Sequence, residues 1–195
     1  MKMTKLLLLT IAVLRVSTSF AQSSCAHKRI FGGEEDPCLD KAPSPSPLVV
    51  ASILITNEAN ETVADMEPAD RTSVSKLLKG LIVHLRNEQQ NDMIVRGDFP
   101  MSGGDNTWFW IVTSADSRPA AFWVQGNGVT ILGSRHNGYA DIQTDWAAGS
   151  HRATRIFRYD GHRYKLSERD TKTCLPSDSN SLESRSEPET ILSRN

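Results

Sequence analysis

The amino-acid sequence predicts an α+β domain in which an antiparallel meander sheet of about six strands carries one packed helix. Three observations predict this fold. Apolar residues recur with a helical period between Val74 and Leu85, and their period changes to about two after Asp92. Three two-residue turn signals then follow, each able to supply the positive φ that tight hairpins need: Gly126-Asn127, Asn137-Gly138 and Asp160-Gly161.

The helix is expected to begin at Asp70 or Thr72, because either side chain can cap a first turn, and to end within residues 87–91. Gly80 weakens it by about 1 kcal/mol relative to alanine. Residues 48–56 form an apolar run that suits either a buried strand or a short helix. The apolar stripe of the helix would consist of Val74, Leu77, Leu78, Leu81, Ile82 and Leu85.

Period-two segments predict the strands. Residues 107–113 carry apolar side chains on both faces, so we expect cover on both sides of that strand. In the last hairpin, a loop of Asp160-Gly161 would place Arg158 opposite Arg163, and Phe157 opposite Tyr164. The strand segments are 93–96, 107–113, 120–125, 128–135, 139–146, 152–159 and 162–167.

Composition indicates one globular domain. The chain has 195 residues, of which 38% are hydrophobic and 23% charged, and its net charge is −1. Those values argue against wholesale disorder, and without a basic excess we expect no nucleic-acid partner. The expected organisation is a signal peptide (1–21), a Pro/Ser-rich tether (22–47), the α+β domain (48–170) and a polar, disordered tail (171–195).

The N-terminus has the pattern of a secretory signal. Lys2 and Lys5 precede an apolar run, residues 6–14, that is too short to span a bilayer, and cleavage is expected before Gln22. Two alternatives stay open: an N-terminal membrane anchor, and lipidation at Cys25. We therefore predict a periplasmic or extracellular protein with no transmembrane segment after cleavage.

Three cysteines, Cys25, Cys38 and Cys174, remain after cleavage. An oxidising compartment favours a disulfide and leaves one cysteine over. A Cys38–Cys174 bond, which we take as the prediction, would join the two flanks of the domain. A Cys25–Cys38 bond would close a short loop instead, and spacing does not choose between them. No metal site is predicted, since no Cys-x-x-Cys pattern occurs.

Residues 137–142 (NGYADI) and 157–164 (FRYDGHRY) resemble a pattern found in small exported bacterial proteins, NGYxDI followed by YRYDGxxY. The resemblance covers residues 92–166. It implies export but no activity, because the function of those proteins is generally unassigned. They often carry a DxNxDG-type segment before the middle strands. Residues 97–105 depart from that pattern, so the resemblance implies no calcium site here.

The predicted function is non-enzymatic binding at the cell envelope, without a cofactor. Asp141, Gln143 and Asp145 alternate along one strand face, opposite the arginines of the last hairpin. This face is either simply solvated or a recognition surface for an envelope protein or polymer. The predicted binding residues are Tyr139, Asp141, Arg158 and Arg163.

The main alternative is a small secreted hydrolase with His136 or His162 as the base and Asp160 beside it, since alternate turns of a meander lie at one end of the sheet. The four tryptophans are expected in the core. Their alternative role is exposure of one or two for sugar or peptide contact. They are Trp108, Trp110, Trp123 and Trp146.

Overall fold

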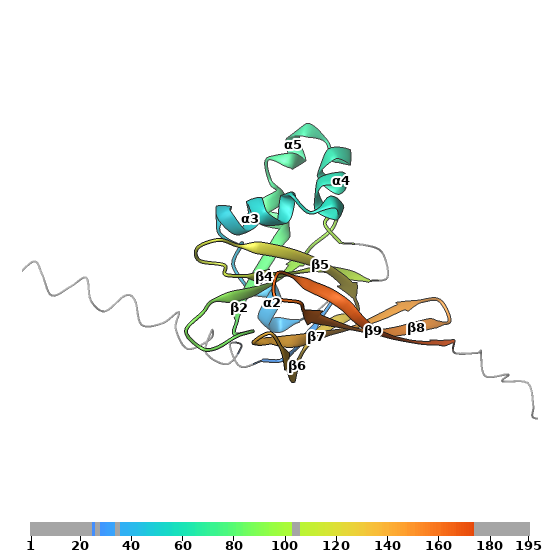
Figure 1. Cartoon of the computed structure of the whole chain (residues 1–195). Helices are drawn as coiled ribbons and strands as arrows, with labels where there is room; N and C mark the ends of the chain where they lie inside the picture. The colour runs from blue at the N-terminus through green and yellow to red at the C-terminus, as the bar shows by residue number, and fades with distance from the viewer. Residues whose placement is uncertain (1–24, 26–27, 34–35, 103–105, 174–195) are drawn as a thin grey trace, which may run out of the picture.

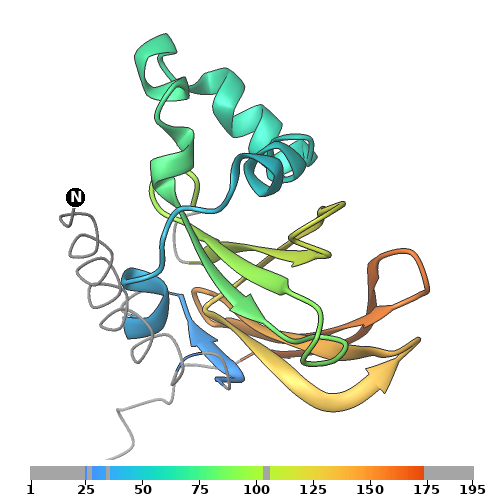
Figure 2. The same ribbon diagram turned by 90° about the vertical axis from the view of Figure 1, so that its left-hand side faces the viewer.

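A computed structural model describes residues 25, 28–33, 36–102 and 106–173. The predicted signal peptide, Cys174 and most of the predicted tail lie outside these residues. Three layers stack on one another: short helices, a four-stranded antiparallel sheet and a five-stranded antiparallel sheet (Figure 1). The turned view in Figure 2 shows the same order, with the helices on one side of the four-stranded sheet and the five-stranded sheet on its other side.

The four-stranded sheet has the order β2-β3-β4-β5, and the five-stranded sheet has the order β1-β6-β7-β8-β9. The helical segments are α2 (Pro37–Asp40), α3 (Pro47–Leu54), α4 (Asn57–Asp65), α5 (Pro68–Arg71) and the 3₁₀ turn η1 (Val74–Leu77). The strands are β1 (Ile30–Gly32), β2 (Leu78–Val83), β3 (Asp92–Gly97), β4 (Thr107–Thr113), β5 (Ala120–Gly126), β6 (Gly128–His136), β7 (Tyr139–Ala148), β8 (His151–Tyr159) and β9 (Tyr164–Thr173).

The fold is mostly β, with two sheets where one was predicted. Strands β3 to β8 lie close to their predicted bounds, whereas the last strand, predicted over residues 162–167, is Tyr164–Thr173. Gly126-Asn127 is not a hairpin turn, because β5 and β6 belong to different sheets. The chain crosses between the sheets here. A Cβ on Gly126 would lie 2.8 Å from the Asp145 carbonyl oxygen, and one on Gly128 would lie 2.6 Å from that of Phe31. Glycine therefore lets the two backbones approach each other at the crossing.

The predicted helix over residues 74–85 is wrong, because residues 78–83 form strand β2 and only the short 3₁₀ turn η1 precedes it in this segment. Tertiary pairing overrides the helical period: all six residues of β2 pair with β3. The supposed stripe is divided between two cores. Val74 and Leu78 pack beneath the helices, whereas Leu81 and Leu85 face the second sheet.

Residues 47–54 are helical, which settles the choice left open for that apolar run. Ser46 caps α3 by accepting a hydrogen bond from the Val49 amide, and Pro47 occupies the first turn. Val49 and Ile53 pack in the same core as Trp110 of β4, whose indole donates to Thr56 Oγ1 at 3.1 Å. The helices thus cover one face of β4, and the five-stranded sheet covers the other, as the two apolar faces of residues 107–113 predicted. No described helix is long and apolar enough to cross a bilayer.

Part of the segment predicted as a tether is folded into the domain. Phe31 on β1 and Leu39 on α2 are fully buried, and β1 pairs with β6 at one edge of the five-stranded sheet. Asp36 connects these elements. Its carboxylate accepts hydrogen bonds from the amides of Gly32, Cys38 and Leu39 and from the Lys28 ammonium.

The disulfide joins Cys25 to Cys38, with a Cα–Cα distance of 5.8 Å. The predicted Cys38–Cys174 bond is therefore wrong, because Cys38 already has a partner. The bond ties the N-terminal segment to α2, and both cysteines pack against the core between the sheets.

The register of the last hairpin also differs from the prediction. Tyr159 pairs with Tyr164 and Arg158 with Lys165, so the loop has four residues instead of two. Asp160 explains the longer loop, because its carboxylate accepts the amides of His162 and Arg163 and so closes an Asx-type turn.

The Asp36 contacts predict a pH-dependent stabilisation. Burial acts to raise the pKa of Asp36, but the Lys28 ammonium and three backbone amides outweigh it and hold the pKa below 3.8. The ionised carboxylate then stabilises the fold above pH 3.8, and this contribution is lost as the pH falls through the lower folded-state pKa. We expect Asp36→Asn to lower the free energy of unfolding at pH 7 by about 1–3 kcal/mol, as measured by urea unfolding.

The difference between wild type and Asp36→Asn should shrink as the pH falls through the lowered folded-state pKa of Asp36, because the wild-type carboxyl group then loses its charge. The matched control is Asp65→Asn, on an exposed position of α4. An equal effect of both variants at pH 7 would contradict the anchoring role of Asp36.

The disulfide yields a second prediction. Its cysteines lie 13 residues apart, and closing a loop of about that size contributes about 3 kcal/mol to stability. We expect Cys25→Ser/Cys38→Ser to lose about 2–4 kcal/mol on chemical unfolding. Cys174→Ser should leave both the stability and the non-reduced Cys25–Cys38 peptide unchanged in mass mapping. A non-reduced peptide that contains Cys174 and Cys38 would refute the assignment.

Candidate functional site

Two candidate sites lie on opposite faces of the five-stranded sheet. We call the first the Asp141 cluster, which comprises Ser134, His136, Asp141, Arg158 and Glu168. The second is a groove between the two sheets, described below. Two of the four predicted binding residues, Asp141 and Arg158, fall in the Asp141 cluster, whereas sequence reasoning missed the groove.

An irregularity in β6 builds the Asp141 cluster. Ile131 pairs with Ile142 and Arg135 with Ala140, so the three residues 132–134 lie opposite Asp141 alone. This bulge brings Ser134 and His136 to the carboxylate. Ser134 Oγ donates to Asp141 Oδ2 at 2.7 Å, and His136 Nδ1 lies 2.7 Å from Oδ1. The buried carboxylate therefore holds the bulge together.

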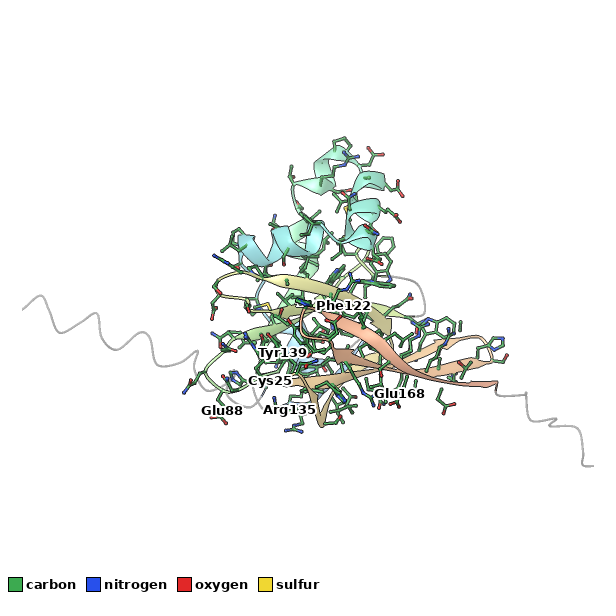
Figure 3. All side chains as sticks on the ribbon, viewed as in Figure 1. Cys25, Glu88, Phe122, Arg135, Tyr139 and Glu168 are labelled. Carbon is green, nitrogen blue, oxygen red and sulfur yellow. A yellow bond between two sulfur atoms is a disulfide. The ribbon has the colours of Figure 1, made fainter. Side chains whose placement is uncertain are left out.

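Arg158 completes the cluster from β8. Its Nε lies 3.8 Å from Asp141 Oδ2, while its two Nη atoms donate to Ser167 Oγ and Glu168 Oε1. Asp141 is only 1% exposed, but the side chains of His136 and Arg158 are 44% and 36% exposed. Asp141 thus positions the cluster from within, and His136 and Arg158 present its outer surface. Figure 3 shows Glu168 on the outer side of this sheet, turned away from Phe122.

Tyr139 is an interior anchor. Its ring stacks on Tyr159 with centroids 3.9 Å apart, and the Arg86 guanidinium lies 4.9 Å from its centroid. Burial raises the pKa of Tyr139 to about 12, so the phenol stays protonated at neutral pH. Arg86 in turn lies 3.6 Å from the buried Asp92, whose carboxylate accepts the amides of Leu85 and Ser114. The network ties the β2–β3 loop to the five-stranded sheet.

Arg163 lies apart from the Asp141 cluster, on the exposed turn between β8 and β9. The Arg163 amide donates to the Asp160 carboxylate. Lys165 occupies the position opposite Arg158 that was predicted for Arg163. Of the four predicted binding residues, the structure therefore brings together Asp141 and Arg158. A binding role for any of the four stays a prediction.

Two residues of the hydrolase alternative, His136 and Asp160, are held in separate interactions. The two turns do lie at one end of the sheet, because Asn137 Nδ2 donates to the Tyr159 carbonyl at 2.7 Å. His136, however, binds Asp141, whereas the Lys165 ammonium and two turn amides occupy Asp160 and hold its pKa well below its usual range. Ser134 donates to the carboxylate and not to the imidazole, so the described hydrogen bonds of this cluster do not form a nucleophile–base pair.

A groove of about 360 Å³ opens between the edge of β5 and the inner face of β8 and β9. Its walls are mainly apolar, with Phe122, Phe157 and Leu166 facing one another across the gap. The rings of Phe122 and Phe157 are 5.5 Å apart. Figure 3 shows Phe122 between the two sheets. The remaining lining residues are Thr56, Glu58, Ala121, Trp123, Val124, Gln125, Arg155 and Arg169.

Two arginines stand at one wall of the groove. Arg155 of β8 and Arg169 of β9 are direct cross-strand partners. Burial and the neighbouring Arg169 charge lower the pKa of Arg155 from its ordinary value. The Arg155 guanidinium lies 5.3 Å from the centroid of the Trp146 ring. None of the ion pairs identified among the described residues involves Arg155 or Arg169.

The pairing of Arg155 with Arg169 depends on a β-bulge in β9. The alternation of residue types in the sequence does not reveal this bulge, so the pair could not be predicted. Phe157 pairs with Leu166, but Ile156 pairs with Glu168, so β9 has one extra residue at this point. Without the extra residue, Arg155 would lie opposite Glu168. The bulge instead turns Glu168 to the outer face, toward Arg158, and leaves Arg155 beside Arg169.

The described residues contain no group of three or more His, Cys, Asp or Glu side chains that could hold a metal ion. In comparisons with known proteins, no protein family model, curated protein or solved structure matched this chain.

Removal of the Asp141 charge tests the account of the outer cluster. Asp141→Asn should lower the free energy of unfolding by about 1–3 kcal/mol, since it weakens bonds to Ser134 and His136 at a buried site. Asp145→Asn, four residues along the same strand but exposed, should cost less than about 1 kcal/mol. Denaturant unfolding of both variants measures the difference, and equal losses would show that Asp141 is not the residue that holds the bulge.

Proposed function

We propose that this protein is an exported, non-enzymatic binding domain of the cell envelope that holds its ligand in the groove between the two sheets. The observation that carries the proposal is the groove itself. Its volume of about 360 Å³ falls in the range of small-molecule sites, and it combines apolar walls with a few polar groups, as such sites do.

Export is supported by the signal-like pattern of residues 1–21 and by the Cys25–Cys38 disulfide. Disulfides persist in oxidising compartments such as the periplasm and the extracellular space. A binding role is favoured over hydrolysis because His136 and Asp160 are each committed to a separate interaction, and Ser134 is not bonded to an imidazole.

Leu166 is the most informative groove residue, because it is a large apolar side chain that is 51% exposed at the end of a folded hairpin. Solvent exposure of such a side chain costs free energy that a bound apolar molecule would recover. Its substitution should therefore weaken binding more than it weakens the fold.

We expect the wild-type protein to bind the neutral fluorescent dye N-phenyl-1-naphthylamine, measured by its fluorescence increase. Leu166→Gln should weaken this binding by about fivefold, which corresponds to about 1 kcal/mol of lost apolar contact. The matched control is Ile30→Gln, an apolar strand residue that is 66% exposed at the opposite edge of the same sheet. Absence of dye binding, or equal losses in both variants, would contradict the proposal.

A further inference from the structure

The arrangement of charges in the groove identifies the class of ligand. Arg155 and Arg169 are neighbours across two strands, and both line the groove. Like charges directly opposite each other destabilise a sheet. The carboxylate that could have neutralised them, Glu168, is bonded to Arg158 on the outer face.

The bulge at Ile156 and Phe157 maintains this separation of charge. It moves Glu168 away from Arg155 and places a second guanidinium in its position. The two guanidinium groups then line a partly enclosed, mainly apolar space. A guanidinium binds carboxylate and phosphate oxygens through paired N–H donors, and the interaction strengthens where water is partly excluded.

The wall of the groove opposite the two arginines determines the orientation of a bound anion. Glu58 at the start of α4 is the one carboxylate among the described residues that line the groove, and no described ion pair links it to either arginine. Its charge repels an anion from the helix side. Phe122, Phe157 and Leu166 leave an apolar surface between the two walls. Trp123 also lines the groove, and its buried indole N–H has no hydrogen-bond partner among the described residues.

We propose that the groove binds an amphipathic anion, in which a carboxylate or phosphate headgroup lies between Arg155 and Arg169 and a single apolar chain packs against Phe122, Phe157 and Leu166. This inference rests on the proposed function, because it names the ligand class of the same groove. The two arginines serve the ligand and not the fold, so their loss weakens binding without weakening the protein.

Calorimetric titration of the oxidised full-length protein with four probes of equal chain length tests the inference. They are decanoate, decyl phosphate, decanol and decyltrimethylammonium, each used below its critical micelle concentration. We expect at least one of the two anions to bind tenfold or more tightly than decanol, and the cation to bind most weakly. Comparison of decanoate with decyl phosphate distinguishes the two headgroups.

Arg155→Gln and Arg169→Gln should each weaken binding of the preferred anion at least tenfold. Their thermal midpoints should equal or exceed that of wild type, since each substitution removes a like-charge contact. Arg118→Gln, on the exposed turn before β5, is the matched control and should bind the anion as wild type does.

The outcomes separate the two proposals. Equal binding of decanol and of both anions, or undiminished anion binding in the two groove variants, overturns the anionic ligand and leaves a neutral binding groove. If neither the dye nor any decyl probe binds, the proposed function fails together with this inference. A fall in thermal midpoint for Arg155→Gln and Arg169→Gln would overturn the claim that these arginines serve a ligand.

Discussion

The constraint on which this structure depends is that both faces of β4 must be covered. Phe109 and Ile111 point to one side and Trp110 and Val112 to the other, and all four are fully buried. A sheet of this kind cannot leave one face in water, so it needs a layer on each side. The helices provide one layer, and the five-stranded sheet provides the other. The crossing at Gly126–Gly128 carries the chain from one sheet to the next, and the N-terminal β1 and α2 complete the same core.

Cover is least complete at the edge strand β5. In this strand Phe122 and Trp123 are only partly buried, in contrast to their neighbours on β4. The β8–β9 hairpin lies across this edge without hydrogen bonding to it, because it belongs to the other sheet. The groove is therefore a consequence of how two sheets of unequal width meet: one ends while the other continues.

Two β-bulges in the five-stranded sheet determine on which face of the sheet its charged side chains lie and which residues they contact. The bulge in β6 gathers Ser134 and His136 around the buried Asp141. The bulge in β9 sends Glu168 outward and keeps Arg169 beside Arg155. Each bulge shifts the strand register by one or two positions. Because side chains alternate along a strand, this shift changes the face on which a charged residue lies or the residue beside it. The same hairpin thus carries an ion network around Arg158 on its outer face and a pair of neighbouring arginines on its inner face.

By itself the sequence determined the strands from residue 92 onward, the tight turn at Asn137-Gly138 and the need for cover on both sides of residues 107–113. These features depend on local alternation and on turn residues, which act over a few positions. Only the tertiary structure decided that residues 78–83 are a strand, that two sheets form, that Cys38 bonds Cys25 and that Arg155 meets Arg169. The apolar spacing of residues 74–85 is compatible with both a helix and a strand, and pairing with β3 selects the strand. Strand register likewise depends on bulges and loop lengths set by distant contacts, so the outer cluster was foreseen only in part and the groove not at all.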